Sequence, residues 1–186
     1  SRKCGTCGHR FVNPKMDFGC ASYCQYAEQC LGALPEEFTG TRDTLLKDKA
    51  AVEMKRLFGT EFKRIRQATA TAQFVENIGK AEGGNLAILL CAAYLHDADL
   101  DASRAILRKV GAGEVMIQDI MTLLQNNGVA LASAPLEAQI MHDALTLQRA
   151  HEEMKDGLIS AKEAQQKCEN AVFTTWAKTH IAHLYD

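Results

Sequence analysis

The sequence of 186 residues has no long apolar run. The longest, Leu86 to Leu95, is far shorter than the roughly 20 residues that cross a bilayer, and no charged-then-apolar leader opens the chain. It has no block of Lys or Arg either, since 21 basic residues face 23 acidic ones and the net charge is -2. Neither a membrane nor a nucleic-acid partner is therefore expected. These features predict a soluble protein.

Strand patterns, internal repeats and low-complexity tracts are missing as well. Neither Gly83-Gly84 nor Gly111-Ala-Gly113 has the flanking strand and helix that a phosphate-binding loop requires. After about residue 44 the chain instead contains apolar stripes with three- and four-residue spacing, the period of amphipathic helices. With 47% hydrophobic residues, the chain is large enough to bury one core. We therefore predict an all-α fold.

The composition changes near Gly32, from a segment rich in Cys and Gly to one rich in Ala, Leu, Lys and Glu. Pro35 and Gly40 punctuate the stretch that follows. The predicted organisation is a Cys-rich module at 1–34, a linker at 35–43 and a helical domain at 44–186.

Caps and stripes predict seven helices in this domain. They are expected from about Thr44 to Phe58, from Thr60 to Gly79, from Leu86 to His96, from Asp101 or Ser103 to Gly111, from about Glu114 to Asn126, from Pro135 through Leu147, and from Ser160 through Ile181. The third is apolar nearly all round, which predicts the central buried helix. Ser160 and Glu163 have the spacing of a capping box.

Five of the seven cysteines lie close together near the N-terminus, with spacings typical of metal ligands: Cys4, Cys7, Cys20, Cys24 and Cys30. Such a cluster suits a reducing, cytoplasmic compartment better than a disulfide scaffold. The Cys4-Gly-Thr-Cys7-Gly segment has the form of a zinc knuckle, so we predict zinc, with an iron–sulfur cluster as the alternative. A tetrahedral site needs four thiolates, and either Cys20 and Cys24 or Cys24 and Cys30 could complete it.

The central helix ends in adjacent His96 and Asp97, which offer two kinds of ligand atom at one helix end. The surrounding pattern consists of Phe58-Gly59, Arg64-Ile65-Arg66, an apolar stripe to Ile78, Gly83-Gly84 and the later segment Ile140 to Leu147. From about Leu45 to Glu153, this chain resembles the HD superfamily of metal-dependent phosphohydrolases, a helical fold named for the His-Asp dyad.

The resemblance implies an HD-type helical bundle with a divalent ion, Mn, Mg, Fe or Ni, held by His96, Asp97 and Asp143. His96 and Asp97 are then the catalytic residues, and the ion activates a water against a phosphate ester. Active members carry a further His at about the position of Gln67, and Gln is a poorer ligand for a transition ion than imidazole.

Gln67, Arg64 and His142 are the candidate substrate contacts. An exposed basic helix face is the alternative interpretation for Arg64, and a half-buried polar position is the alternative for His142. The leading hypothesis is a metal-dependent phosphohydrolase acting on a small phosphorylated substrate, including nucleotides. The alternative is a degenerate, non-hydrolytic HD scaffold that binds a nucleotide or a protein, with the Cys module as its recognition or redox-sensing element.

Overall fold

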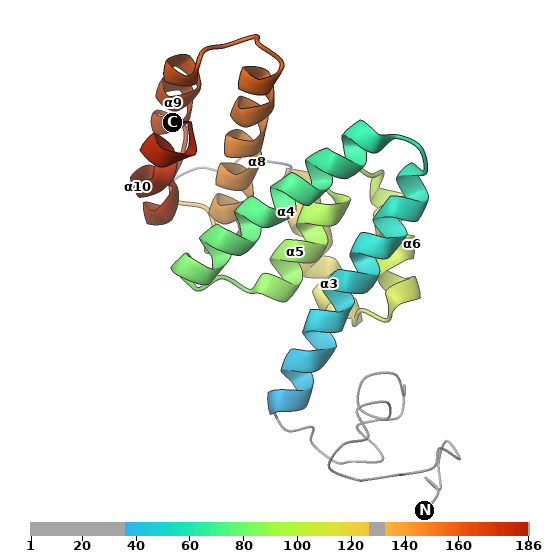
Figure 1. Ribbon diagram of the computed structural model, residues 1–186. Coiled ribbons are helices and arrows are strands. Elements are labelled where there is room, and N and C mark those ends of the chain that lie inside the picture. The colour runs from blue at the N-terminus through green and yellow to red at the C-terminus, as the bar shows by residue number, and fades with distance from the viewer. Residues whose placement is uncertain (1–35, 127–132, 186) are drawn as a thin grey trace, which may run out of the picture. The chain divides into compact units, whose positions relative to one another are not determined.

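The computed structural model describes residues 36–126 and 133–185, with side chains described from residue 46 onward. Within these ranges there are eight helices and no strand (Figure 1). The predicted all-α class is therefore confirmed for the described residues. The chain divides into two compact units, 1–48 and 49–186, and the boundary falls inside the first described helix.

Helix α3 (Glu36–Phe58) begins earlier than predicted. Residues 36–43, expected as a linker, are helical, and the start at about Thr44 is wrong. Gly40 within a helix costs only about 1 kcal/mol relative to Ala. The end agrees with the prediction, since Gly59 follows with a positive φ of 54°.

Helix α4 (Phe62–Glu82) passes through Gly79, the predicted stop, and ends at Gly83 with a φ of 83°. Its N-cap is Glu61 rather than Thr60. Gly79 serves packing, because a Cβ placed there would lie 2.8 Å from Leu86 Cδ2. The two stop signals look alike in sequence, and the close approach of the next helix decides between them.

Helix α5 (Leu86–Leu95) is the predicted central helix, and most of its residues are buried. Its N-cap is Asn85, whose side chain accepts hydrogen bonds from the backbone N–H groups of Ala87 and Ile88. Cys91, predicted as a core residue, is fully buried. This helix packs against α4 and also contacts α7 and α8.

The next helices are α6 (Leu100–Val110), α7 (Glu114–Asn126) and α8 (Leu136–Lys155). Helix α7 has the predicted bounds, and α8 begins one residue later than predicted, with Pro135 as its N-cap rather than in its first turn. Helix α6 starts at Leu100, so Ser103 is an interior buried residue rather than the first. Gly111 ends it in the left-handed conformation.

The predicted last helix is two helices, α9 (Ala161–Glu169) and α10 (Thr175–Leu184). The capping box of Ser160 and Glu163 is confirmed. The chain breaks between the helices because the backbone N–H groups of Phe173 and Thr174 donate to the carboxylate of Asp143. Thr174 then caps α10. A contact 30 residues away in sequence therefore ends the periodic pattern.

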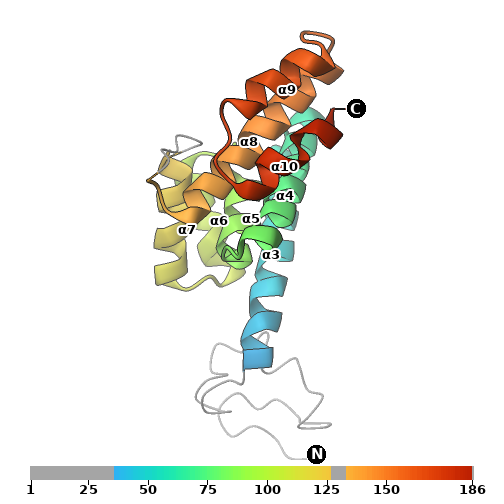
Figure 2. The same ribbon diagram turned by 90° about the vertical axis from the view of Figure 1, so that its left-hand side faces the viewer.

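Helix α4 lies against both α5 and α8, while α9 packs on α8 and α10 packs on α9 and α4 (Figures 1 and 2). This packing brings the end of α5 beside the first turns of α4 and the last turns of α8. In the described part of the chain, no helix has the combination of length and apolar character that spanning a membrane requires.

Candidate ligand pocket

A pocket of about 330 Å³ lies where these three helices meet. Helices α4 and α8 and the end of α5 supply most of its lining, which consists of Lys63, Gln67, His96, Asp97, Gln148, Arg149, Glu152, Glu153, Asp156 and Leu158. The volume is at the small end of the range found for ligand cavities. Three residues predicted from sequence therefore line one pocket, namely Gln67, His96 and Asp97.

His96 follows the last turn of α5, and its ring nitrogen Nδ1 lies 2.8 Å from the carbonyl oxygen of Ala93. A carbonyl only accepts, so Nδ1 carries the proton and Nε2 keeps its lone pair. Burial lowers the pKa of His96 below its ordinary value, although the negative charge of Asp97 opposes this effect. The neutral imidazole therefore offers the pocket an acceptor.

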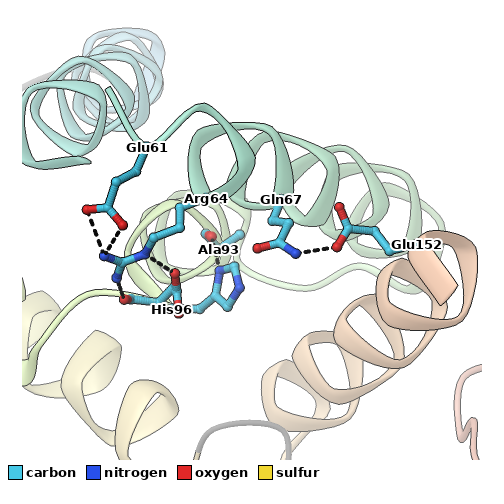
Figure 3. A network of polar contacts seen from close by, with 7 residues as sticks. Glu61, Arg64, Gln67, Ala93, His96 and Glu152 are labelled. Atoms are coloured by element: carbon cyan, nitrogen blue, oxygen red, sulfur yellow. Dashed lines mark hydrogen bonds and ion pairs between the residues drawn. The ribbon is translucent and has the colours of Figure 1, made fainter. Parts of the chain in front are cut away.

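Asp97 is held by Arg64. Arg64 comes from the first turn of α4 and also reaches Glu61 (Figure 3). The guanidinium Nε lies 2.5 Å from Asp97 Oδ2, and a second guanidinium nitrogen donates to the backbone oxygen of Asp97. Arg64 also lies over the ring of Phe58, 4.1 Å from its centroid, and pairs with Glu61. Arg64 is absent from the pocket lining, so it positions Asp97 rather than facing the cavity.

Gln67 lies one turn further along α4 and points at helix α8 (Figure 3). Its side-chain amide donates a hydrogen bond to the carboxylate of Glu152. A histidine at this position would offer a metal a lone pair, whereas the amide nitrogen offers only hydrogens. In this chain the residue therefore orients a carboxylate of the pocket.

Asp143 is not brought together with His96 and Asp97. It lies on α8, is fully buried, and does not line the pocket. Its carboxylate accepts hydrogen bonds from both Phe173 N and Thr174 N, and from the hydroxyl of Thr174. These bonds occupy the oxygens that a metal would need.

His142 likewise lies outside the pocket. Its Nδ1 is 3.2 Å from Asp143 Oδ1, and its ring packs against Phe173 with centroids 5.1 Å apart. This half-buried polar environment is the alternative considered for His142 in the sequence.

The donor set of the helical unit does not fit the expected three-ligand ion. Across residues 36–126 and 133–185, no three His, Cys, Asp or Glu side chains are grouped so that they could hold a metal ion. The guanidinium of Arg64 lies beside the Asp97 carboxylate, and its positive charge repels a cation at that carboxylate. The five N-terminal cysteines lie outside the described residues, and the zinc site stays a prediction.

Helix α8 supplies four pocket residues that sequence reasoning missed, Gln148, Arg149, Glu152 and Glu153, and Asp156, its C-cap, is a fifth. Gln148 is 4% exposed, and its amide nitrogen has no hydrogen-bond partner. The sequence offered one signal, because Gln148 stands four residues after Ala144 and three after Leu145 and therefore shares the helix face of these apolar residues. A buried amide on an apolar face needs a partner.

Comparisons with protein families, curated proteins and solved structures find no match to this chain.

Proposed function

We propose that the helical unit is an HD-type scaffold that binds a small polar molecule in the pocket and does not hydrolyse phosphate esters. The observation that carries the proposal is the unpartnered amide nitrogen of Gln148, buried in the pocket lining. An unsatisfied buried donor is costly, on the order of 1–3 kcal/mol, and turning the Gln148 amide toward an acceptor bound in the pocket would relieve that cost.

The carboxylates support the same conclusion. Asp97 is paired with Arg64, and Asp143 accepts the backbone of the α9–α10 junction. Hydrolysis assisted by a metal needs an ion with open coordination positions for water and phosphate. Two of the three expected ligands are engaged in protein contacts that fix structure.

The test is a hydrolysis assay on the full chain with p-nitrophenyl phosphate and a panel of nucleoside monophosphates, each with added Mg²⁺, Mn²⁺ or Ni²⁺. We expect no turnover above the rate without protein in any metal. Turnover that disappears in Asp97→Ala would overturn the proposal and restore the hydrolase hypothesis.

For the N-terminal module we propose a zinc-bound recognition or redox-sensing element. The zinc-knuckle spacing of Cys4 and Cys7 carries this proposal. Elemental analysis of anaerobically purified protein is expected to show one zinc per chain, unchanged in Asp97→Ala. A brown protein would establish the iron–sulfur alternative, and a second ion lost in Asp97→Ala would place a metal in the helical unit.

A further inference from the structure

The charges of the pocket are mostly neutralised in pairs. Asp97 pairs with Arg64 at 2.5 Å, Glu153 with Lys167 at 2.6 Å, and Asp156 with Lys63 at 3.6 Å. Each of these carboxylates therefore has a cation of the protein beside it. The charged lining residues that remain are Arg149 and Glu152.

Arg149 and Glu152 each lack an oppositely charged partner within the described residues. Arg149 is exposed and takes part in none of the ion pairs among the described residues, and Glu152 contacts the neutral amide of Gln67 instead of a cation. The two residues are three apart on α8, so they are neighbours on the helix surface, yet they do not pair. The pocket thus presents one uncompensated charge of each sign.

The hydrogen-bonding groups follow the same division. Gln148 is next to Arg149 in sequence and also lines the pocket, and its amide nitrogen, although covered by the protein, has no hydrogen-bond partner. Two side chains that can donate hydrogen bonds therefore come from adjacent residues of α8. The carboxylate of Glu152 is held in place by Gln67, and the neutral His96 adds an acceptor. An anion alone would leave Glu152 uncompensated, and a cation alone would leave Arg149 and Gln148 without partners.

We infer that the ligand of this pocket is a compact zwitterion, with a carboxylate or phosphate on Arg149 and Gln148 and an ammonium group on Glu152. This inference rests on the proposed binding function and names its ligand class. Gln67 acts as a positioning residue, because its amide orients Glu152 without neutralising it.

Matched probes test the inference on the full chain by isothermal titration calorimetry. The zwitterions are 4-aminobutanoate and O-phosphoethanolamine. Butanoate and ethyl phosphate keep only the anion, while 1-aminobutane and ethanolamine keep only the amine. We expect one zwitterion to bind at least about ten-fold more tightly than either singly charged analogue, since a charge-assisted hydrogen bond is worth about that factor or more. Which zwitterion binds distinguishes carboxylate from phosphate.

Variants assign the two ends. Arg149→Gln should weaken binding of the zwitterion about ten-fold and leave binding of the amine analogue unchanged. Glu152→Gln should also weaken binding of the zwitterion about ten-fold, but it should leave binding of the anion analogue unchanged. The matched controls are Arg108→Gln and Glu114→Gln, which make the same substitutions in an exposed ion pair between α6 and α7. This ion pair lies outside the pocket lining. These two variants should bind as wild type.

Gln148→Met separates binding from folding. It removes the unpartnered donor, so thermal stability should be unchanged or higher while zwitterion affinity falls.

The inference is overturned if neither zwitterion binds more tightly than its analogues, or if Arg149→Gln and Glu152→Gln bind like wild type. A nucleoside monophosphate that binds through Gln148 while both zwitterions fail would overturn the ligand class and leave the binding function standing. Hydrolysis dependent on Asp97 would overturn the binding function itself.

Discussion

Two regions of the helical unit each contain a histidine followed directly by an aspartate, and they use the pair in different ways. At the α9–α10 junction, Asp143 is fully buried and His142 packs beside it. At the pocket, the Asp97 side chain is 44% exposed and Arg64, not His96, contacts it. The same two residue types thus form a structural contact in one region and part of a cavity lining in the other.

The difference lies in what the carboxylate accepts. Asp143 receives backbone N–H groups from a segment 30 residues later, so it determines where one helix ends and the next begins. Asp97 receives a guanidinium at the surface, where water can replace a lost partner. Adjacency of His and Asp therefore does not define a site, whereas the partners of the carboxylate do.

The comparison is tested most strongly by Asp143→Ala. The substitution leaves two backbone N–H groups and the Thr174 hydroxyl without their acceptor, and buried unsatisfied donors are costly. We expect the free energy of unfolding to fall by about 2–4 kcal/mol. Urea unfolding followed by circular dichroism measures this change.

Thr174→Val is the matched control for that variant. It removes one hydrogen bond to Asp143 and the N-cap of α10 but keeps the side-chain shape, so it should lower stability by about 1–2 kcal/mol. In the double variant the two losses should be less than additive, because the residues share one network. Additive losses would mean that Asp143 does not act through the junction.

Much of the fold followed from local signals. Asn85 before α5 and the Ser160–Glu163 box before α9 are local side-chain caps, and a window of a few residues contains everything needed to recognise them. The choice between Gly79 and Gly83 was different. Both residues suit a helix end, and the packing of Leu86 against Gly79 decided the outcome.

The candidate site was less visible in sequence. His96 and Asp97 could be predicted because they end an apolar helix. Asp143 was predicted from the segment Ile140 to Leu147, and the structure places it outside the pocket in a fully buried position. Arg149 and Glu152 belong to no motif. Their importance comes from the charges that remain after their neighbours have paired, which only the folded arrangement reveals.

His96→Gln tests the pocket through pH. Burial and the charges of Arg149 and Arg64 lower the pKa of His96, and Asp97 raises it. On acidification through the ordinary histidine pKa of about 6.5, the unfolded chain gains a proton that the native protein does not. Stability should therefore fall as pH drops toward the lowered native pKa, by about 1.4 kcal/mol for each unit of difference.

Glutamine does not titrate, so His96→Gln should remove this part of the pH dependence. The free energy of unfolding of both proteins, measured between pH 8 and 5, gives the comparison. All other histidines are common to the two proteins, and the difference in slope therefore reports His96 alone. Identical slopes would show that burial does not disfavour the charged imidazole.

Asp97→Asn should have the smallest effect on stability, below about 1 kcal/mol, because its ion pair with Arg64 is exposed to solvent. The substitution should still be visible at His96. Without the negative charge of Asp97, the pKa of His96 should fall further, and a titration followed by NMR of the imidazole signals measures the change.

Asp143→Asn is the counterpart in the other region, and it should lower stability more than Asp97→Asn while leaving the His96 titration unchanged. If Asp97→Asn instead destabilised the protein as much as Asp143→Asn, the distinction between a structural and a pocket carboxylate would not hold.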